Sequence, residues 1–138
     1  MIRHVLLDTG PLVAFLNRRD RYHLWAVDQF ARLRPPLGTC EAVLSEACFL
    51  LQRYPGGPES ALELLRRQLV TVTFRLEEEV TAVTRLLSRY ANVRMSLADA
   101  CLVRMSEQRS ESGVLTLDRH FRLYRRRGRE VIHAIMPG

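Results

Sequence analysis

The chain has 138 residues, of which 47% are hydrophobic and 26% charged, a composition that excludes disordered and membrane-embedded classes. Its formal net charge is +6 and all 21 basic residues are arginine, which suits a polyanionic partner such as nucleic acid, or equally a basic protein that binds nothing. No apolar run is long enough to span a bilayer and no signal peptide precedes the first strand, so we expect a single cytoplasmic domain over residues 1–138.

The first predicted element is a short strand over residues 5–7. Its uninterrupted apolar run is typical of a strand buried on both faces. The strand ends at Asp8, and Gly10 and Pro11 separate it from a helix that continues to Leu16. Ligands of open α/β sheets bind beyond the carboxyl ends of the strands, so we expect Asp8 at the mouth of such a crevice.

The other elements follow from the spacing of apolar residues. Helical spacing predicts helices over residues 23–33, 40–53, 58–67, 77–90 and 96–105. Strands are predicted over residues 69–76, 114–117 and 131–135, with a brief one over 37–39. This alternation predicts an α/β fold, a three-layer α/β/α sandwich on a mainly parallel central sheet. Because the three cysteines are odd in number and sit in apolar helical patterns, we expect buried free thiols.

Four acidic residues each have an ordinary structural explanation. Asp8 could form an Asx-type turn, and Asp118 could cap a short helix that follows it. Ser96 and Asp99 have the spacing of a capping box. Glu46 lies at the border of the apolar stripe of its helix, where its aliphatic stem could cover apolar surface.

Together, however, the same acids indicate a common site. The chain contains only five aspartates, and Asp8 and Asp118 each follow an apolar strand. In a parallel sheet these two emerge at the same edge, and helices that begin there would bring Glu46 and Asp99 alongside. Crowded carboxylates repel one another unless a cation holds them, and Mg²⁺ or Mn²⁺ suits oxygen ligands. Since such an ion can activate water and neutralise a phosphate, the pattern is typical of a phosphodiester hydrolase.

The residues around the acids resemble a known family. The segments Val-Leu-Leu-Asp8-Thr-Gly-Pro-Leu-Val-Ala, Ser-Glu46-Ala, Ser-Leu-Ala-Asp99-Ala and Thr-Leu-Asp118-Arg-His-Phe occur in the order found in PIN domains. The chain is most similar to the VapC-like toxins of bacterial toxin–antitoxin pairs, from Val5 to Ile135. It departs from the family pattern at Gly10, where many members have serine or asparagine.

The resemblance implies an endoribonuclease that uses one or two Mg²⁺ or Mn²⁺ ions and leaves a 5′-phosphate and a 3′-hydroxyl. It also implies an RNA substrate, a homodimer, and a cognate antitoxin that fills the acidic groove. Thr9 and Thr116 match hydroxyl positions near the metal site of such proteins. The residues that it marks as both catalytic and metal-binding are Asp8, Glu46, Asp99 and the more variable fourth acid, Asp118.

An arginine-rich stretch follows Asp118, with Phe121 and Tyr124 interleaved. It could grip an RNA backbone and stack on bases, or equally form a solvated basic face whose aromatic residues pack inward. The arginines of this stretch that we assign to RNA binding are Arg119, Arg122, Arg125 and Arg126.

Two further functions stay open. The chain could be a non-catalytic PIN-like domain that binds RNA or protein, although the presence of all four acids argues against that. It could also be a PIN nuclease of RNA processing or DNA repair rather than a toxin. A haloacid-dehalogenase-like phosphatase is excluded because it needs an aspartate where Gly10 stands, and nucleotide-binding folds are excluded because no glycine-rich phosphate loop follows the first strand.

Overall fold

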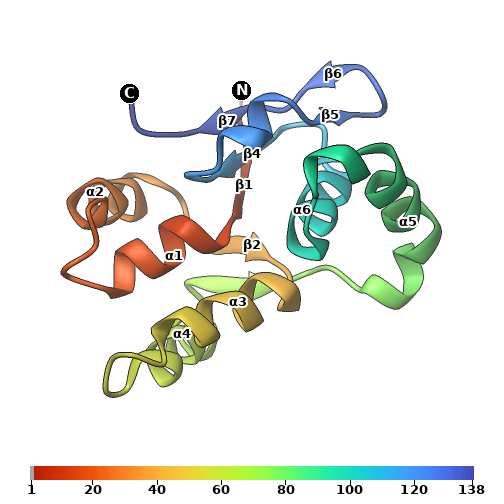
Figure 1. Cartoon of the computed structure of the whole chain (residues 1–138). Helices are drawn as coiled ribbons and strands as arrows, with labels where there is room; N and C mark the ends of the chain where they lie inside the picture. Colours follow the sequence, from red (N-terminus) through yellow and green to blue (C-terminus); the bar gives the residue numbers. More distant parts are fainter. Residues whose placement is uncertain (1) are drawn as a thin grey trace.

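The computed structural model describes residues 2–138, which form a five-stranded sheet with helices packed on both sides (Figure 1). The strand order is β3-β2-β1-β4-β7, and every pairing is parallel. The strands are β1 (His4–Leu7), β2 (Leu37–Thr39), β3 (Val70–Val72), β4 (Ser112–Leu115) and β7 (Ala134–Ile135). The predicted α/β sandwich with a mainly parallel sheet is therefore confirmed.

The helices form two groups around the sheet. In Figure 1, the first four pack against one another at the left and bottom, and the last two pack as a pair at the right. The first group is α1 (Thr9–Leu16), α2 (His23–Arg32), α3 (Glu41–Leu51) and α4 (Gly57–Arg66), and the second is α5 (Val80–Arg89) and α6 (Leu97–Gln108). Two short 3-10 helices, η1 (Leu76–Glu79) and η2 (Ala91–Val93), flank α5, and η3 (Arg119–Arg122) follows β4.

The core lies where the central strands meet the helices. Leu7 of β1 and Leu115 of β4 are directly paired in the sheet and are both fully buried. Leu102 of α6 and Val43 of α3 pack in the same apolar cluster from the two helical groups. Burial of these side chains holds the carboxyl ends of β1 and β4 in fixed positions, which matters for the residues that follow them.

The predicted strand over residues 69–76 was too long. Only Val70–Val72 pairs, because β3 is an edge strand whose one neighbour, β2, is itself three residues long. The helix predicted over residues 77–90 also differs. Leu76–Glu79 forms a 3-10 turn, and the α-helix begins at Val80 because Glu79 leaves the helical backbone region (φ −117°, ψ 16°).

The predicted strand over residues 131–135 divides into two elements. Glu130–Val131 forms β6, which pairs antiparallel with β5 (Arg125–Arg126), whereas β7 joins the main sheet. A turn at Arg127 (φ 51°) and Gly128 (φ 82°) reverses the chain between β5 and β6. Two-residue strands carry too little apolar alternation to be recognised in a sequence.

Cys40 and Cys101 are buried, Cys48 is half-buried, and all three are free thiols, as expected except for the partial exposure of Cys48. Within residues 2–138, none of the helices has the length and apolar character needed to cross a membrane. The single domain predicted over residues 1–138 stays a prediction.

Candidate functional site

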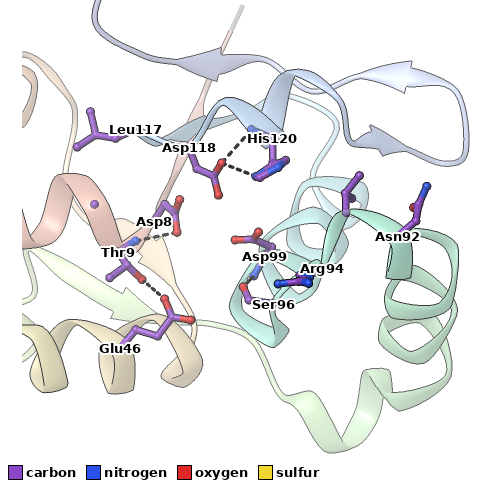
Figure 2. Close-up of a pocket in the computed structure, with 12 residues that line it drawn as sticks. Asp8, Thr9, Glu46, Asn92, Arg94, Ser96, Asp99, Leu117, Asp118 and His120 are labelled. Atoms are coloured by element: carbon purple, nitrogen blue, oxygen red, sulfur yellow. Dashed lines mark hydrogen bonds and ion pairs between the residues drawn. The ribbon is translucent and has the colours of Figure 1, made fainter.

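Four carboxylates from distant parts of the chain line one cavity of about 730 Å³ at the carboxyl ends of β1 and β4 (Figure 2). Asp8 directly follows β1 and Asp118 follows β4, so the parallel pairing of these strands places both at the same edge. Glu46 reaches the cavity from α3 and Asp99 from the first turn of α6. The sheet therefore gathers the four acids that the sequence analysis singled out, while their roles stay predictions.

Asp8 is the most enclosed of the four, with 6% of its surface exposed. It caps α1, because its Oδ1 accepts a hydrogen bond from the Thr9 backbone N–H at 2.8 Å. Its Oδ2 accepts one from the Thr116 hydroxyl at 2.7 Å. Burial raises the pKa of Asp8 from 3.8 to about 6, and the charges of Asp99 and Asp118 add to that effect while the two hydrogen bonds oppose it.

Asp99 faces Asp8 from α6 and is 8% exposed. Ser96 caps this helix by accepting a hydrogen bond from the Asp99 backbone N–H at 3.0 Å, which is half of the predicted capping box. The Tyr124 hydroxyl donates to Asp99 Oδ2 at 2.8 Å. Burial raises the pKa of Asp99, the Tyr124 hydrogen bond lowers it, and the nearby charges of Asp118 and Glu46 raise it further.

Glu46 and Asp118 are more accessible to solvent. The Thr9 hydroxyl donates to Glu46 Oε2 at 3.0 Å, so Thr9 joins α1 to α3 at the rim of the cavity. Asp118 caps η3 through the His120 backbone N–H, and the His120 ring nitrogen Nδ1 also lies 2.9 Å from Asp118 Oδ1. The Asp118 backbone N–H donates to the Thr116 hydroxyl oxygen, which therefore links Asp118 to Asp8.

The local hydrogen bonds of these four acids do not prevent their side chains from lining one cavity. Asp118 caps η3 with Oδ1 alone, whereas Asp8, which caps α1, has both carboxylate oxygens hydrogen-bonded. Within residues 2–138, Oδ1 of Asp99, Oδ2 of Asp118 and Oε1 of Glu46 accept no hydrogen bond from another side chain or from a loop N–H. Of these three residues only Asp118 caps a helix terminus, whereas Glu46 lies within α3 and Asp99 lies in the first turn of α6, which Ser96 caps.

The donor set fits a hard divalent cation. The cavity presents carboxylate oxygens from four residues, and two of these have a raised pKa because burial and neighbouring negative charge disfavour ionisation. A cation would relieve that cost. Among residues 2–138, no group of three His, Cys, Asp or Glu side chains is already arranged to hold a metal ion.

Sequence reasoning missed several residues of this site. Arg94 and Asn92 line the cavity from the segment between α5 and α6, and Figure 2 shows Arg94 next to Asp99 and Ser96. Arg94 adopts a left-handed backbone conformation (φ 54°), for which an arginine gives no signal in a sequence. Tyr124 packs inward, as one of the two alternatives for the arginine-rich stretch predicts, but its hydrogen bond to Asp99 depends on tertiary contacts alone.

The arginines assigned to RNA binding occupy different environments. Arg119 and Arg122 on η3 are exposed, whereas Arg125 is half-buried and donates to the backbone carbonyls of Arg122, Leu123 and Tyr124. Arg126 is only 6% exposed and donates to the carbonyl of Ser110 at 3.1 Å. A contact between Arg126 and RNA would require this side chain to leave the protein interior, so Arg119 and Arg122 are the better candidates.

Comparisons with known proteins identify relatives of this arrangement. A sequence model of the PIN domain matches residues 5–127. A search among curated proteins found no significant match. Among solved structures, the chain is similar to the crystal structure of VapC20 of Mycobacterium tuberculosis, a sarcin-ricin loop cleaving toxin, with a TM-score of 0.67 and 24% sequence identity. The match covers 80% of this chain and 86% of VapC20, and it establishes a shared fold.

Proposed function

Because the chain belongs to the PIN-domain family, we propose that it is a metal-dependent endoribonuclease. The observation that carries this proposal is the convergence of four carboxylates in one cavity, two of them buried with raised pKa values. The PIN family is one of nucleases, which supports the reaction class. The residues proposed to hold Mg²⁺ or Mn²⁺ are Asp8, Glu46, Asp99 and Asp118.

A bound ion would supply a water of lowered pKa and positive charge beside the scissile phosphate. The protein's own contribution is to fix the carboxylates. Thr116 holds Asp8 and the backbone of Asp118, Thr9 holds Glu46, and Tyr124 holds Asp99. His120 also lines the cavity, with its Nδ1 2.9 Å from Asp118 Oδ1, and we propose that the four carboxylates would hold an ion that supplies the activated water.

Arginines at the rim of the cavity supply positive charge for the phosphates of the RNA substrate. Arg94 lines the cavity, and Arg119 stands beside Asp118 on η3. Within residues 2–138, neither makes an ion pair with an acidic side chain. We assign them, together with Arg122, to phosphates that flank the cut, because guanidinium groups bind phosphate oxygens in pairs.

The proposal extends to biological context. The fold likeness to the VapC20 toxin supports a role as the toxin of a toxin–antitoxin pair. From the resemblance to VapC-like toxins we also propose that the protein acts on cytoplasmic RNA as a homodimer. A cognate antitoxin would place a segment in the acidic cavity and block it. Co-expression with the product of an adjacent small gene, followed by co-purification and loss of nuclease activity, tests this part separately.

The direct test of the nuclease is cleavage of total cellular RNA by the purified protein with Mg²⁺, Mn²⁺ or EDTA. The proposal predicts discrete cuts that require metal, leave 5′-phosphate and 3′-hydroxyl ends, and disappear in Asp99→Asn. Asp28→Asn is a matched control, because Asp28 is an exposed residue of α2 that pairs with Arg32 at 3.0 Å. RNA binding by the wild type without cleavage in any metal would instead favour a non-catalytic PIN domain.

Thr116→Val is expected to weaken metal binding about 10- to 100-fold, the usual cost of losing a hydrogen bond that orients a metal ligand. The substitution removes the hydroxyl that donates to Asp8 Oδ2 and accepts from the Asp118 backbone. Calorimetric titration with Mn²⁺ measures the change, and Thr116→Ser, which keeps the hydroxyl, should restore most of it. Equal affinity for Thr116→Val and the wild type would show that Thr116 does not orient the ligands.

Arg94→Ala is expected to weaken RNA binding about tenfold without altering Mn²⁺ affinity, because it removes one phosphate contact and no metal ligand. The slope of log Kd against log salt concentration should fall by about one. Fluorescence anisotropy with a labelled RNA in EDTA measures both values. Arg85→Ala on the exposed face of α5, away from the cavity, is the control. If both substitutions weakened RNA binding equally, Arg94 would contribute only through the overall charge of the protein and not through a specific phosphate contact.

A further inference from the structure

A second cavity of about 840 Å³ lies away from the carboxylates, on the face of the sheet that carries Leu6. Leu6 of β1 pairs with Gly38 of β2, which pairs with Thr71 of β3, so these residues lie in one row. Side chains two positions apart share a face of a strand, which adds His4 and Thr73 to the same surface. Three adjacent strands therefore form the floor of this cavity.

Gly38 has no side chain, which leaves space above the floor of the cavity. A Cβ atom built on Gly38 would lie 3.4 Å from Leu6 Cδ2, 3.7 Å from Thr73 Oγ1 and 4.0 Å from Met105 Cε, all ordinary contacts. Met105 belongs to α6, so this helix borders the floor at Gly38. A Cβ atom is therefore accommodated at position 38, and a larger side chain there would occupy space in the cavity.

The rim of the cavity is basic. Arg3, Arg34 and Arg109 line it, and no Asp or Glu does. Arg3 pairs with Glu111 at 3.0 Å, but Arg34 and Arg109 have no acidic partner within residues 2–138. The Arg109 guanidinium instead lies 3.3 Å from a ring nitrogen of His4. Two unpaired guanidinium groups over an open cavity provide the forked donors that recognise phosphate.

We propose that this cavity binds a nucleotide, with its phosphate on Arg34 and Arg109 and its base over the sheet floor around Leu6 and Gly38. The volume lies within the range of ligand-binding cavities and far exceeds the space that a lone phosphate needs. The Thr71 and Thr73 hydroxyls can hydrogen-bond to the sugar or base edge, and the guanidinium planes can stack on a base. The nucleotide is either free or part of an RNA that extends beyond the cleavage site.

The site is independent of the proposed nuclease activity. Helix α6 begins at the carboxylate cavity with Ser96 and ends beside Arg109, and its 12 residues separate the two sites by about 18 Å. The two cavities also have opposite charge. In EDTA the carboxylate cavity has no cation to offset its acids, and substitution of Arg34 and Arg109, which line only the second cavity, identifies the nucleotide binding that belongs there.

The test is calorimetric titration of the full chain in EDTA with AMP, adenosine and inorganic phosphate. AMP should bind at least about tenfold more tightly than adenosine or phosphate alone, since it engages both the guanidinium groups and the floor. The double substitution Arg34→Ala/Arg109→Ala should weaken AMP binding by about tenfold or more, and Gly38→Leu should do the same by filling the floor. Arg18→Ala/Arg19→Ala, at exposed positions outside both cavities, should leave it unchanged.

Absence of AMP binding at about 10 mM, or equal binding by the wild type and both cavity variants, would overturn the proposal. Competition with a short single-stranded RNA identifies the source of the nucleotide. If the RNA displaces AMP from the wild type, the cavity holds a nucleotide of the RNA, and if it does not, the ligand is a free nucleotide. Loss of cleavage in Asp99→Asn is a separate result, so failure of the nuclease and failure of this site can be distinguished.

Discussion

Asp8→Asn is expected to stabilise the metal-free protein at pH 7 while reducing RNA cleavage about a thousandfold. The wild-type carboxyl is buried, which raises its pKa from 3.8 to about 6, so ionising it at neutral pH costs about 3 kcal/mol at 1.36 kcal/mol for each pKa unit. Asparagine has nearly the same shape and is neutral, so it avoids most of this cost. The same change removes a proposed metal ligand, and a bound metal contributes several kcal/mol to hydrolysis.

The prediction is specific because Asp8→Asn is expected to raise the stability of the protein and to lower its activity. Chemical denaturation in EDTA at pH 7 measures stability, and cleavage of RNA in Mn²⁺ measures activity. Asp28→Asn, at an exposed position on α2, should change neither quantity by much. A destabilised Asp8→Asn would contradict the account of burial, because it would mean that the charged carboxylate is favourable in the absence of metal. An active Asp8→Asn would contradict the assignment of the site.

The wild-type protein in EDTA is expected to lose stability as the pH rises from about 4 to 7. Between pH 3.8 and about 6, the folded state keeps a proton on Asp8 that the unfolded chain has released. Stability is therefore greatest below the unfolded pKa and falls by about 3 kcal/mol as the pH passes through the folded value. The raised pKa of Asp99 acts in the same direction.

A divalent ion should reverse this loss at pH 7. At 100 times its dissociation constant, Mn²⁺ would add about 2.7 kcal/mol if it binds only the folded state. Thermal unfolding at pH 4.5 and pH 7, with EDTA and with Mn²⁺, measures the effect. Stabilisation by Mn²⁺ should be large at pH 7 and small at pH 4.5, where protons compete for the carboxylates. The same stabilisation in Asp8→Asn would place the ion elsewhere on the protein.

The sequence predicts those features of the fold that depend on short segments, such as apolar runs and helix-capping residues. The apolar run before Asp8 indicates a buried strand, and Ser96 together with Asp99 indicates a helix start, as observed. Asp118 was expected to cap a short helix, and it caps η3. Once a parallel sheet is assumed, these same local signals bring the acids to one edge, because strand ends and helix starts meet there.

The features that the sequence does not reveal depend on contacts between distant segments. Tyr124 binds Asp99 from 25 positions away, and the pairing of β5 with β6 involves only two residues from each strand. Arg126 looks like its exposed neighbours in sequence, yet it is buried against the Ser110 carbonyl. In these cases tertiary packing determines the environment of a residue whose sequence neighbourhood is unremarkable in composition.

Calorimetric titration of the EDTA-treated and dialysed protein with Mn²⁺ at pH 7 tests the central claim most directly. The account predicts saturable binding to the wild type and to Asp28→Asn. It predicts loss of that binding in Asp8→Asn and in Asp99→Asn, because these two buried carboxylates face one cavity from β1 and α6. Binding of equal strength to all four proteins would contradict the claim that the carboxylates form one metal site.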